Sequence, residues 1–253
     1  GTVQEVERLA STIRACPQAS AVLVQVTRVT MKLPVIAALT VESLGYATLQ
    51  GGAEFSRWQN GRQKTQTGDS GILEPVEIVR TGAELHIQLN SPENRNALSV
   101  AMRDGLTEAF KLVSMDDSIE QVVVSGAGPS FSAGGDLTEF GTTRDLVEAH
   151  RIRQLKMPAR YLAEHAQRYR FDLHGACIGA GIELPAFAGH ITATRDTFFR
   201  LPEVAMGLIP GAGGCVSIPR RIGRHRTNYL AVTGMALSAE DALSWGLIDE
   251  LND

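Results

Sequence analysis

The chain has 253 residues, 43% hydrophobic and 21% charged, which is the composition of an ordinary soluble globular protein. Its formal net charge of -4 provides no positive field for a nucleic-acid backbone or an anionic membrane surface, so neither partner is expected. The longest apolar stretches, near residues 33–41 and 177–189, contain proline or glutamate and are shorter than the ~20 residues of a membrane span.

The first sixty residues have the apolar period of α-helices. Apolar residues recur at that period in two runs separated by Pro17: Val3, Val6, Leu9 and Ile13, then Val22, Val26 and Val29. A third helix is predicted over residues 35–50, because Pro34 suits a helix start and Gly51-Gly52 a helix end. Phe55 and Trp58 would share one face of a short fourth helix.

Residues 61–74 are polar, rich in glycine and without a period, which predicts a linker. The predicted organisation is therefore a helical region over residues 1–60, the linker, and a second region over residues 75–253.

The second region reads as an α/β domain. From Val76 the apolar period changes to two, which predicts a hairpin across Thr81-Gly82. Strands and helices then alternate. Strands are predicted at 122–124, 171–173 and 191–193, and helices after Ser99, over 143–167 with a break at Pro158, and between Ser238 and Gly246.

Three cysteines, Cys16, Cys177 and Cys215, lie far apart and show neither CxxC nor zinc-finger spacing. We therefore expect free thiols and a reducing, cytoplasmic location. The first residues lack Met and the features of a signal peptide, which indicates a processed chain or the middle of a longer gene product.

Two Gly-rich turns, over residues 126–136 and 174–183, follow predicted buried strands. Such turns expose backbone N–H groups, and a helix N-terminus adds partial positive charge, so each turn can stabilise an anion. Either turn alone is weak evidence, because tight strand-to-helix turns are common.

The combination of motifs is more specific, and it resembles the crotonase superfamily. The matching segments are SPENRNAL at 91–98, FSAGGDL at 131–137, the turn ending in Glu183-Leu184, LPE at 201–203 leading into 207–214, Thr233-Gly234, and 246–249. Their order and spacing agree over about 175 residues. The resemblance implies a ClpP/crotonase-type core of stacked ββα turns.

In that family two backbone N–H groups hold a thioester carbonyl, and the matching positions are Gly135 and Ala180. The resemblance also implies that Glu183 and Glu203 are the acid/base carboxylates of a hydratase. Asn94, Arg95, Asp136, Leu137 and Thr138 match positions near CoA, and residues 142–167 would form the acyl pocket. No metal or redox cofactor is implied, since CoA arrives as part of the substrate.

The chain ends differ from the family pattern. Crotonases continue after a segment like 245–250 with helices that build trimers or hexamers, and residues 1–60 resemble that tail. This predicts a circularly permuted crotonase whose trimerisation region comes from the N-terminus, with Arg62 or Lys64 near the CoA phosphates. The rival interpretation is that residues 1–60 end a truncated upstream repeat. Pro185 is a smaller departure, expected to kink the helix after the second turn.

The sequence therefore predicts hydration of a 2-enoyl-CoA, with Δ3,Δ2-enoyl-CoA isomerisation as the alternative within the superfamily. A catalytically silent acyl-CoA binder or scaffold is the alternative of another class. A third reading comes from Gly175-Ala176-Cys177-Ile178-Gly179, which matches a hydrolase nucleophile elbow with Cys in place of Ser, followed in order by Asp196 and His225.

Overall fold

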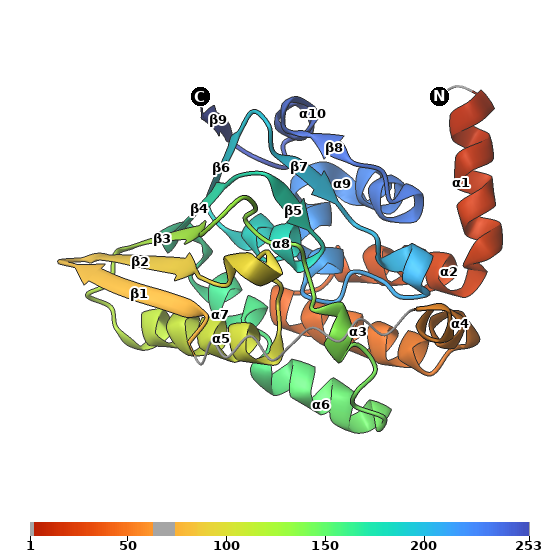
Figure 1. Cartoon of the computed structure of the whole chain (residues 1–253), viewed down its shortest axis with the longest axis horizontal. Coiled ribbons are helices and arrows are strands. Elements are labelled where there is room, and N and C mark those ends of the chain that lie inside the picture. The colour runs from red at the N-terminus through yellow and green to blue at the C-terminus, as the bar shows by residue number, and fades with distance from the viewer. Residues whose placement is uncertain (1–2, 63–73, 253) are drawn as a thin grey trace.

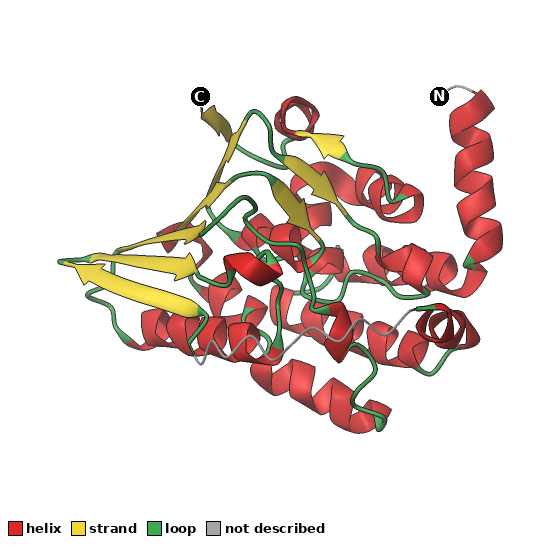
Figure 2. Ribbon diagram, viewed as in Figure 1, coloured by secondary structure: helices red, strands yellow, loops and turns green. Residues whose placement is uncertain are grey.

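The larger of two β-sheets lies along one side of the molecule, at the left in Figures 1 and 2, and helices from both ends of the sequence lie mainly below it and to its right. The computed structural model describes residues 3–62 and 74–252. The helices are α1 (Val3–Ala15), α2 (Pro17–Thr30), α3 (Val35–Gln50), α4 (Ala53–Gly61), α5 (Val100–Met115), α6 (Leu146–Lys156), α7 (Ala159–Glu164), α8 (Ala180–Glu183), α9 (Gly214–Thr233) and α10 (Ala239–Trp245). The strands are β1 (Val76–Thr81), β2 (Glu84–Leu89), β3 (Gln121–Gly126), β4 (Tyr169–Leu173), β5 (Ala176–Ile178), β6 (His190–Thr194), β7 (Phe198–Arg200), β8 (Leu237–Ser238) and β9 (Glu250–Asn252).

The larger sheet has the strand order β1-β2-β3-β4-β6-β9. Its first two strands form the predicted antiparallel hairpin, with Thr81 opposite Glu84, and every later pairing is parallel. Strand β3 is buried between its neighbours, and Val122 and Val124 have no exposed surface. The strand predicted at 122–124 is therefore present, but only the face that bears Val122 and Val124 is fully buried, because Val123 on the other face is half-buried.

A smaller sheet, β5-β7-β8, stands beside the larger one, and the chain alternates between the two. Strand β4 lies in the larger sheet, β5 in the smaller one, and α8 follows; β6, β7 and α9 repeat this order. This succession is the stacked ββα arrangement that the sequence predicts.

Local signals mark the helix ends as expected. The Ser99 hydroxyl accepts a hydrogen bond from Met102 N at the start of α5, and Ser238 does the same for Asp241 N in α10. Pro158 separates α6 from α7. These ends were predictable because each depends on a few adjacent residues.

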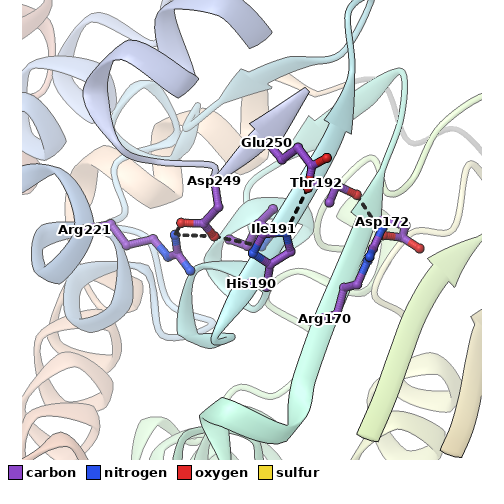
Figure 3. A network of polar contacts seen from close by, with 8 residues as sticks. All are labelled: Arg170, Asp172, His190, Ile191, Thr192, Arg221, Asp249 and Glu250. Atoms are coloured by element: carbon purple, nitrogen blue, oxygen red, sulfur yellow. Dashed lines mark hydrogen bonds and ion pairs between the residues drawn. The ribbon is translucent and has the colours of Figure 1, made fainter. Parts of the chain in front are cut away.

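Strand β9 was not predicted from the sequence, and Figure 3 shows the polar contacts that hold its start against the core. The Asp249 carboxylate accepts a hydrogen bond from Ile191 N at 2.8 Å and pairs with Arg221 of α9 at 3.1 Å. The His190 ring contacts Glu250 at 3.3 Å. His190, which had no predicted role, thus lies in a junction of β6, β9 and α9.

The N-terminal helices pack against the second region rather than apart from it (Figure 1). Helix α2 contacts α9, and α3 contacts both α6 and α9. If residues 1–60 replace the family's tail, the apolar residues Leu9, Ile13, Val26, Val29, Phe55 and Trp58 are expected to be buried against the core or a neighbouring subunit. Val26 and Phe55 are 5% and 2% exposed, and Leu9 and Trp58 pack against the core.

Two of the expected positions differ. Ile13 and Val29 are 41% and 46% exposed in the single chain, because they point away from the core that α1 and α2 cover. Their burial against a neighbouring subunit remains a prediction. Most of the linker predicted for 61–74, including Lys64, lies outside the described residues.

All three cysteines are free and buried. Within the described ranges, no helix combines the length and the apolar character needed to cross a bilayer.

Candidate active site

A cavity of about 350 Å³ lies between the two Gly-rich turns and the helices α3 and α6, a size typical of small-molecule sites. It receives side chains from both regions of the sequence. Its lining includes Tyr46, Gln50, Leu98, Arg103, Gly135, Asp136, Phe140, Thr142, Ile152, Arg153, Met157, Ala180, Glu183, Glu203, Gly211 and Ala212.

The backbone N–H groups of Gly135 and Ala180 are available at this cavity. Leu98 N donates to Gly134 O at 2.7 Å and Leu98 O accepts from Asp136 N at 3.2 Å. Because strand alternation turns the intervening amide away from that pairing, the Gly135 N–H faces the other side. Ala180 is the first residue of α8, where N–H groups have no partner within the helix. Across residues 3–62 and 74–252, neither group donates a hydrogen bond.

The two predicted glutamates, Glu183 and Glu203, both lie against Gly179. Its φ of 50° and ψ of -120° suit glycine. A Cβ atom at this position would lie 2.5 Å from Glu203 Oε1 and 3.7 Å from Glu183 Oε1. Both predicted carboxylates therefore border the same point of the turn, and only glycine leaves room for them.

The Glu183 carboxylate is anchored on one side. Its Oε2 accepts hydrogen bonds from Ala212 N at 2.7 Å and Gly214 N at 2.9 Å. Burial raises the pKa of Glu183 to about 7, and these two N–H donors oppose the rise because they stabilise the carboxylate. The expected kink at Pro185 is wrong: α8 ends at Glu183, and Pro185 starts a separate 3-10 turn because a proline begins a helical turn more readily than it continues one.

Glu203 contrasts with Glu183. It opens the 3-10 turn Glu203–Met206, is 8% exposed, and its buried Oε2 has no hydrogen-bond partner in the described chain. Burial raises its pKa well above the ordinary value, and the nearby Glu183 charge raises it further. Of the two carboxyl groups, Glu203 therefore keeps its proton more readily.

A third buried carboxylate, Glu42 of α3, was missed from the sequence. Its two oxygens accept hydrogen bonds from Gly213 N at 2.7 Å and Cys215 N at 2.8 Å. Glu42 and Glu183 thus alternate along four consecutive N–H groups, 212–215, at the start of α9. The available signal was its helical spacing from Ala38 and Tyr46, which share the buried face of α3.

Arg153 of α6 was also missed. Its guanidinium lies over the Tyr46 ring at 3.9 Å, and Nη2 donates to Gln50 Oε1 at 2.9 Å. Burial raises the pKa of Tyr46 to about 12. The segment 142–167, predicted to form the acyl pocket, does supply cavity-lining residues, Arg153 and Met157 among them.

The residues predicted to bind CoA are brought together beside this cavity. Asp136 accepts hydrogen bonds from Asn94 Nδ2 at 3.2 Å and from Thr138 N at 2.9 Å. Arg62 donates to the Leu137 carbonyl and stacks on Trp58. Arg95, next to Asn94, has a left-handed φ of 50°.

The hydrolase interpretation is wrong. Cys177 lies inside β5 with no exposed surface, and burial raises the pKa of its thiol, the opposite of what a thiolate nucleophile needs. Asp196 bonds to Thr194 instead of a histidine. His174 bonds to Gly128 O at 2.9 Å, as expected for a strand-end residue. Within the described ranges, no group of three or more His, Cys, Asp or Glu side chains is arranged to hold a metal ion.

Comparisons with known proteins identify the family of this chain. A family model described as enoyl-CoA hydratase/isomerase matches residues 81–252. The mitochondrial Delta(3,5)-Delta(2,4)-dienoyl-CoA isomerase of Rattus norvegicus is 34% identical over 182 residues, covering 66% of this chain and 55% of that protein. The 2,3-dehydroadipyl-CoA hydratase of Escherichia coli is 30% identical over 174 residues, covering 69% of this chain and 68% of that protein.

Among solved structures, the enoyl-CoA hydratase from Thermoplasma volcanium matches with a TM-score of 0.64 and 34% identity, covering 71% of this chain and 72% of that one. The chain spans just over half the length of the dienoyl-CoA isomerases it matches. The family match begins after α1–α4 and includes both Gly-rich turns and both predicted glutamates. This chain therefore belongs to the enoyl-CoA hydratase/isomerase family, within the crotonase superfamily.

Proposed function

We propose that this protein adds water to a 2-enoyl-CoA thioester. The observation that carries the proposal is the unequal pair of buried carboxyl groups at Gly179. One is anchored by two N–H donors, and the other has a buried Oε2 without a hydrogen-bond partner among the described residues. Two acid/base groups of different proton affinity suit a reaction in which one removes a proton and the other supplies one.

The thioester carbonyl would accept hydrogen bonds from Gly135 N and Ala180 N. As hydroxide adds to C3, negative charge develops on the carbonyl oxygen, and these fixed N–H groups stabilise it. One donor of this kind is typically worth about 3 to 4 kcal/mol of barrier. The donors are backbone groups, so their position depends on the two turns.

The proton transfers follow from the two environments. Glu183, ionised because the 212 and 214 N–H groups stabilise its charge, removes a proton from the attacking water. The water oxygen bonds to C3, and the C2=C3 pair of electrons moves toward the carbonyl. Glu203, protonated because burial and the nearby Glu183 charge disfavour its ionised form, gives its proton to C2, and the product is a 3-hydroxyacyl-CoA.

Δ3,Δ2-Enoyl-CoA isomerisation is the second candidate. It moves a proton between carbons on one face of the substrate, and a single unpartnered carboxyl group such as Glu203 can do this. Relatives named as isomerases also support it. Glu183 favours hydration, because a second carboxylate is required only when water must be oriented and deprotonated.

A panel of 2-enoyl-CoA thioesters of increasing chain length tests the proposal. Hydration removes the conjugated double bond, so absorbance of the enoyl thioester should fall. A panel of 3-enoyl-CoA thioesters, assayed for the gain of the same absorbance, tests isomerisation. Binding of CoA thioesters without turnover on either panel would favour the silent-binder interpretation.

For the assembly, we propose that residues 1–60 take the place of the family's C-terminal tail and that the protein forms trimers or hexamers. The contacts of α2 and α3 with α9 support this role, as does the delivery of Glu42 to the site. The exposed apolar residues Ile13 and Val29 provide surface for a neighbouring subunit.

A further inference from the structure

We propose that the acyl group of the substrate ends in a carboxylate and that Arg153 binds it, an inference that rests on the proposed acyl-CoA function. The observation is a partly buried guanidinium that lines the ligand cavity and, among the described residues, has only neutral hydrogen-bond partners.

The partners of Arg153 leave its charge unmatched. Nη2 donates to the Gln50 amide oxygen at 2.9 Å and Nη1 to the Ala149 carbonyl at 3.4 Å. Within residues 3–62 and 74–252, Arg153 forms no ion pair. A guanidinium has five N–H donors in a planar fork, so groups remain for an acceptor in the cavity.

The surrounding acidic groups do not replace that acceptor. Glu42 is a carboxyl group that favours the charge on Arg153, but both of its oxygens are occupied by backbone N–H groups at the start of α9. A second cavity-lining arginine, Arg103, is already paired with Asp104 at 2.8 Å. Arg103 is close enough to disfavour the charge on Arg153. An anion entering here would therefore relieve a repulsion and gain a charge-assisted hydrogen bond.

The position of Arg153 separates this contact from CoA binding. Arg153 also lines a smaller cavity of about 30 Å³ between α3 and α6, together with Glu42, Met157 and Gly211. None of the six residues predicted to bind CoA lines that cavity. Arg153 thus marks the α3–α6 side of the site, which suits the far end of an acyl chain.

The contacts that fix the Arg153 guanidinium favour specific recognition of a carboxylate over a general attraction for anions. The ring of Tyr46, 8% exposed, lies against one face of the guanidinium, and Gln50 fixes an edge. A planar fork held in this way matches a carboxylate geometrically, whereas a methyl terminus would leave the partly buried charge without an anionic partner.

Two six-carbon 2-enoyl-CoA substrates, one ending in a carboxylate and one in a methyl group, test the proposal. Wild-type protein should have a kcat/KM about 10- to 100-fold higher for the carboxylate-ended substrate, the range expected for a charge-assisted hydrogen bond. Arg153→Met, similar in length but uncharged, should abolish the preference by lowering only the carboxylate-ended value. Arg153→Lys should retain part of it.

The control is Arg151→Met, which removes an exposed arginine from the same helix, where it pairs only with Glu148. It should leave the preference unchanged. The proposal is wrong if wild type shows no preference, or if Arg153→Met lowers kcat/KM equally for both substrates. It is also wrong if Arg153→Met weakens the binding of free CoA as much as the binding of the carboxylate-ended thioester. That result would mean that Arg153 binds the CoA phosphates.

Calorimetric binding of the two saturated six-carbon acyl-CoAs separates this proposal from the reaction itself. A preference for the carboxylate-ended compound that Arg153→Met removes supports the substrate class even if neither enoyl-CoA is hydrated. Equal affinities for the two compounds overturn it even if hydration is observed.

Discussion

Glu203 is expected to contribute to catalysis and to reduce the stability of the fold, because its buried Oε2 has no hydrogen-bond partner among the described residues. Glu203→Gln should remove hydration and isomerisation together, with a loss of about 10² to 10⁴ in kcat, the usual contribution of a general acid or base. Steady-state kinetics on 2-enoyl-CoA and 3-enoyl-CoA substrates measure this. Retention of either activity would contradict a shared proton-transfer role.

The same substitution should stabilise the fold above pH 5. The pKa of Glu203 is raised in the folded state, so the folded protein binds its proton more tightly than the unfolded chain does. Wild-type stability from this group is therefore fully present below about pH 4.3, its unfolded pKa, and is lost as the pH rises toward the folded value. Glu203→Gln has no such loss, so its melting temperature should exceed that of wild type by more at pH 8 than at pH 5.

Glu183 is expected to be ionised when it deprotonates water. Because its pKa is raised to about 7, its ionisation should limit the rate near neutral pH. Wild-type kcat/KM for hydration should rise as the pH increases through about 7 and fall again where Glu203 loses its proton. Glu183→Gln should reduce hydration more than isomerisation, since only hydration needs a deprotonated water. Equal losses in the two assays would refute this division of roles.

At the scale of elements, the junction of α3 with the start of α9 decides how the site is held. Glu42 binds two of the four N–H groups whose other two hold Glu183. Glu42→Gln keeps the shape but has only one acceptor oxygen, so the 212–215 segment should loosen and kcat should fall about tenfold, as for a lost hydrogen bond to a charged group. Because the charge of Glu42 raises the pKa of Glu203, its removal should also move the basic limb of the pH profile to lower pH.

Glu54→Gln is the matched control for this junction. Glu54 is 5% exposed, and its carboxylate oxygens accept hydrogen bonds from Gln18 N and Ala19 N at the start of α2. It resembles Glu42 in burial and bonding, yet it binds the start of α2 instead of the 212–215 segment that holds Glu183. We expect both variants to unfold at lower temperature than wild type, and only Glu42→Gln to shift the pH profile. A shift of similar size in both would reduce Glu42 to a structural role.

For the whole molecule, the helices α1–α4 are expected to be indispensable. A chain beginning at Gly71 loses Glu42 and Tyr46 from the site and uncovers the core under Leu23 and Phe55, both at most 2% exposed. Each such side chain is worth ~1.5 to 3 kcal/mol of burial, so this chain should be insoluble or unable to form the native oligomer. Sedimentation and enoyl-CoA turnover measure the two consequences.

A chain beginning at Cys16 provides the comparison. It loses only α1, whose residues Val3, Val6 and Ile13 are exposed in the single chain. It should stay soluble and keep the cavity, although its oligomeric state will change if α1 meets a neighbouring subunit. The proposed role of residues 1–60 fails if the Gly71 chain is soluble, trimeric and fully active.

The sequence by itself determined the features that depend on adjacent residues. The hairpin at Thr81-Gly82 and the caps at Ser99 and Ser238 follow from period, turn chemistry and capping, which act over a few positions. The ββα succession was implied by the resemblance of the motifs to the crotonase superfamily. The paired glutamates at 183 and 203 were likewise recognisable from their motifs, and the structure brings them to the same side of Gly179.

Only the tertiary structure decided which side chains complete the cavity. Glu42 and the N–H groups of Gly213 and Cys215 that donate to it are more than 170 positions apart, and Arg153 meets Tyr46 and Gln50 from a different helix. Strand β9 similarly forms by pairing with the edge of β6, which is distant in sequence. Neighbouring residues do not determine where such a polar side chain or short strand lies. Its burial and pairing depend on partners that are distant in sequence.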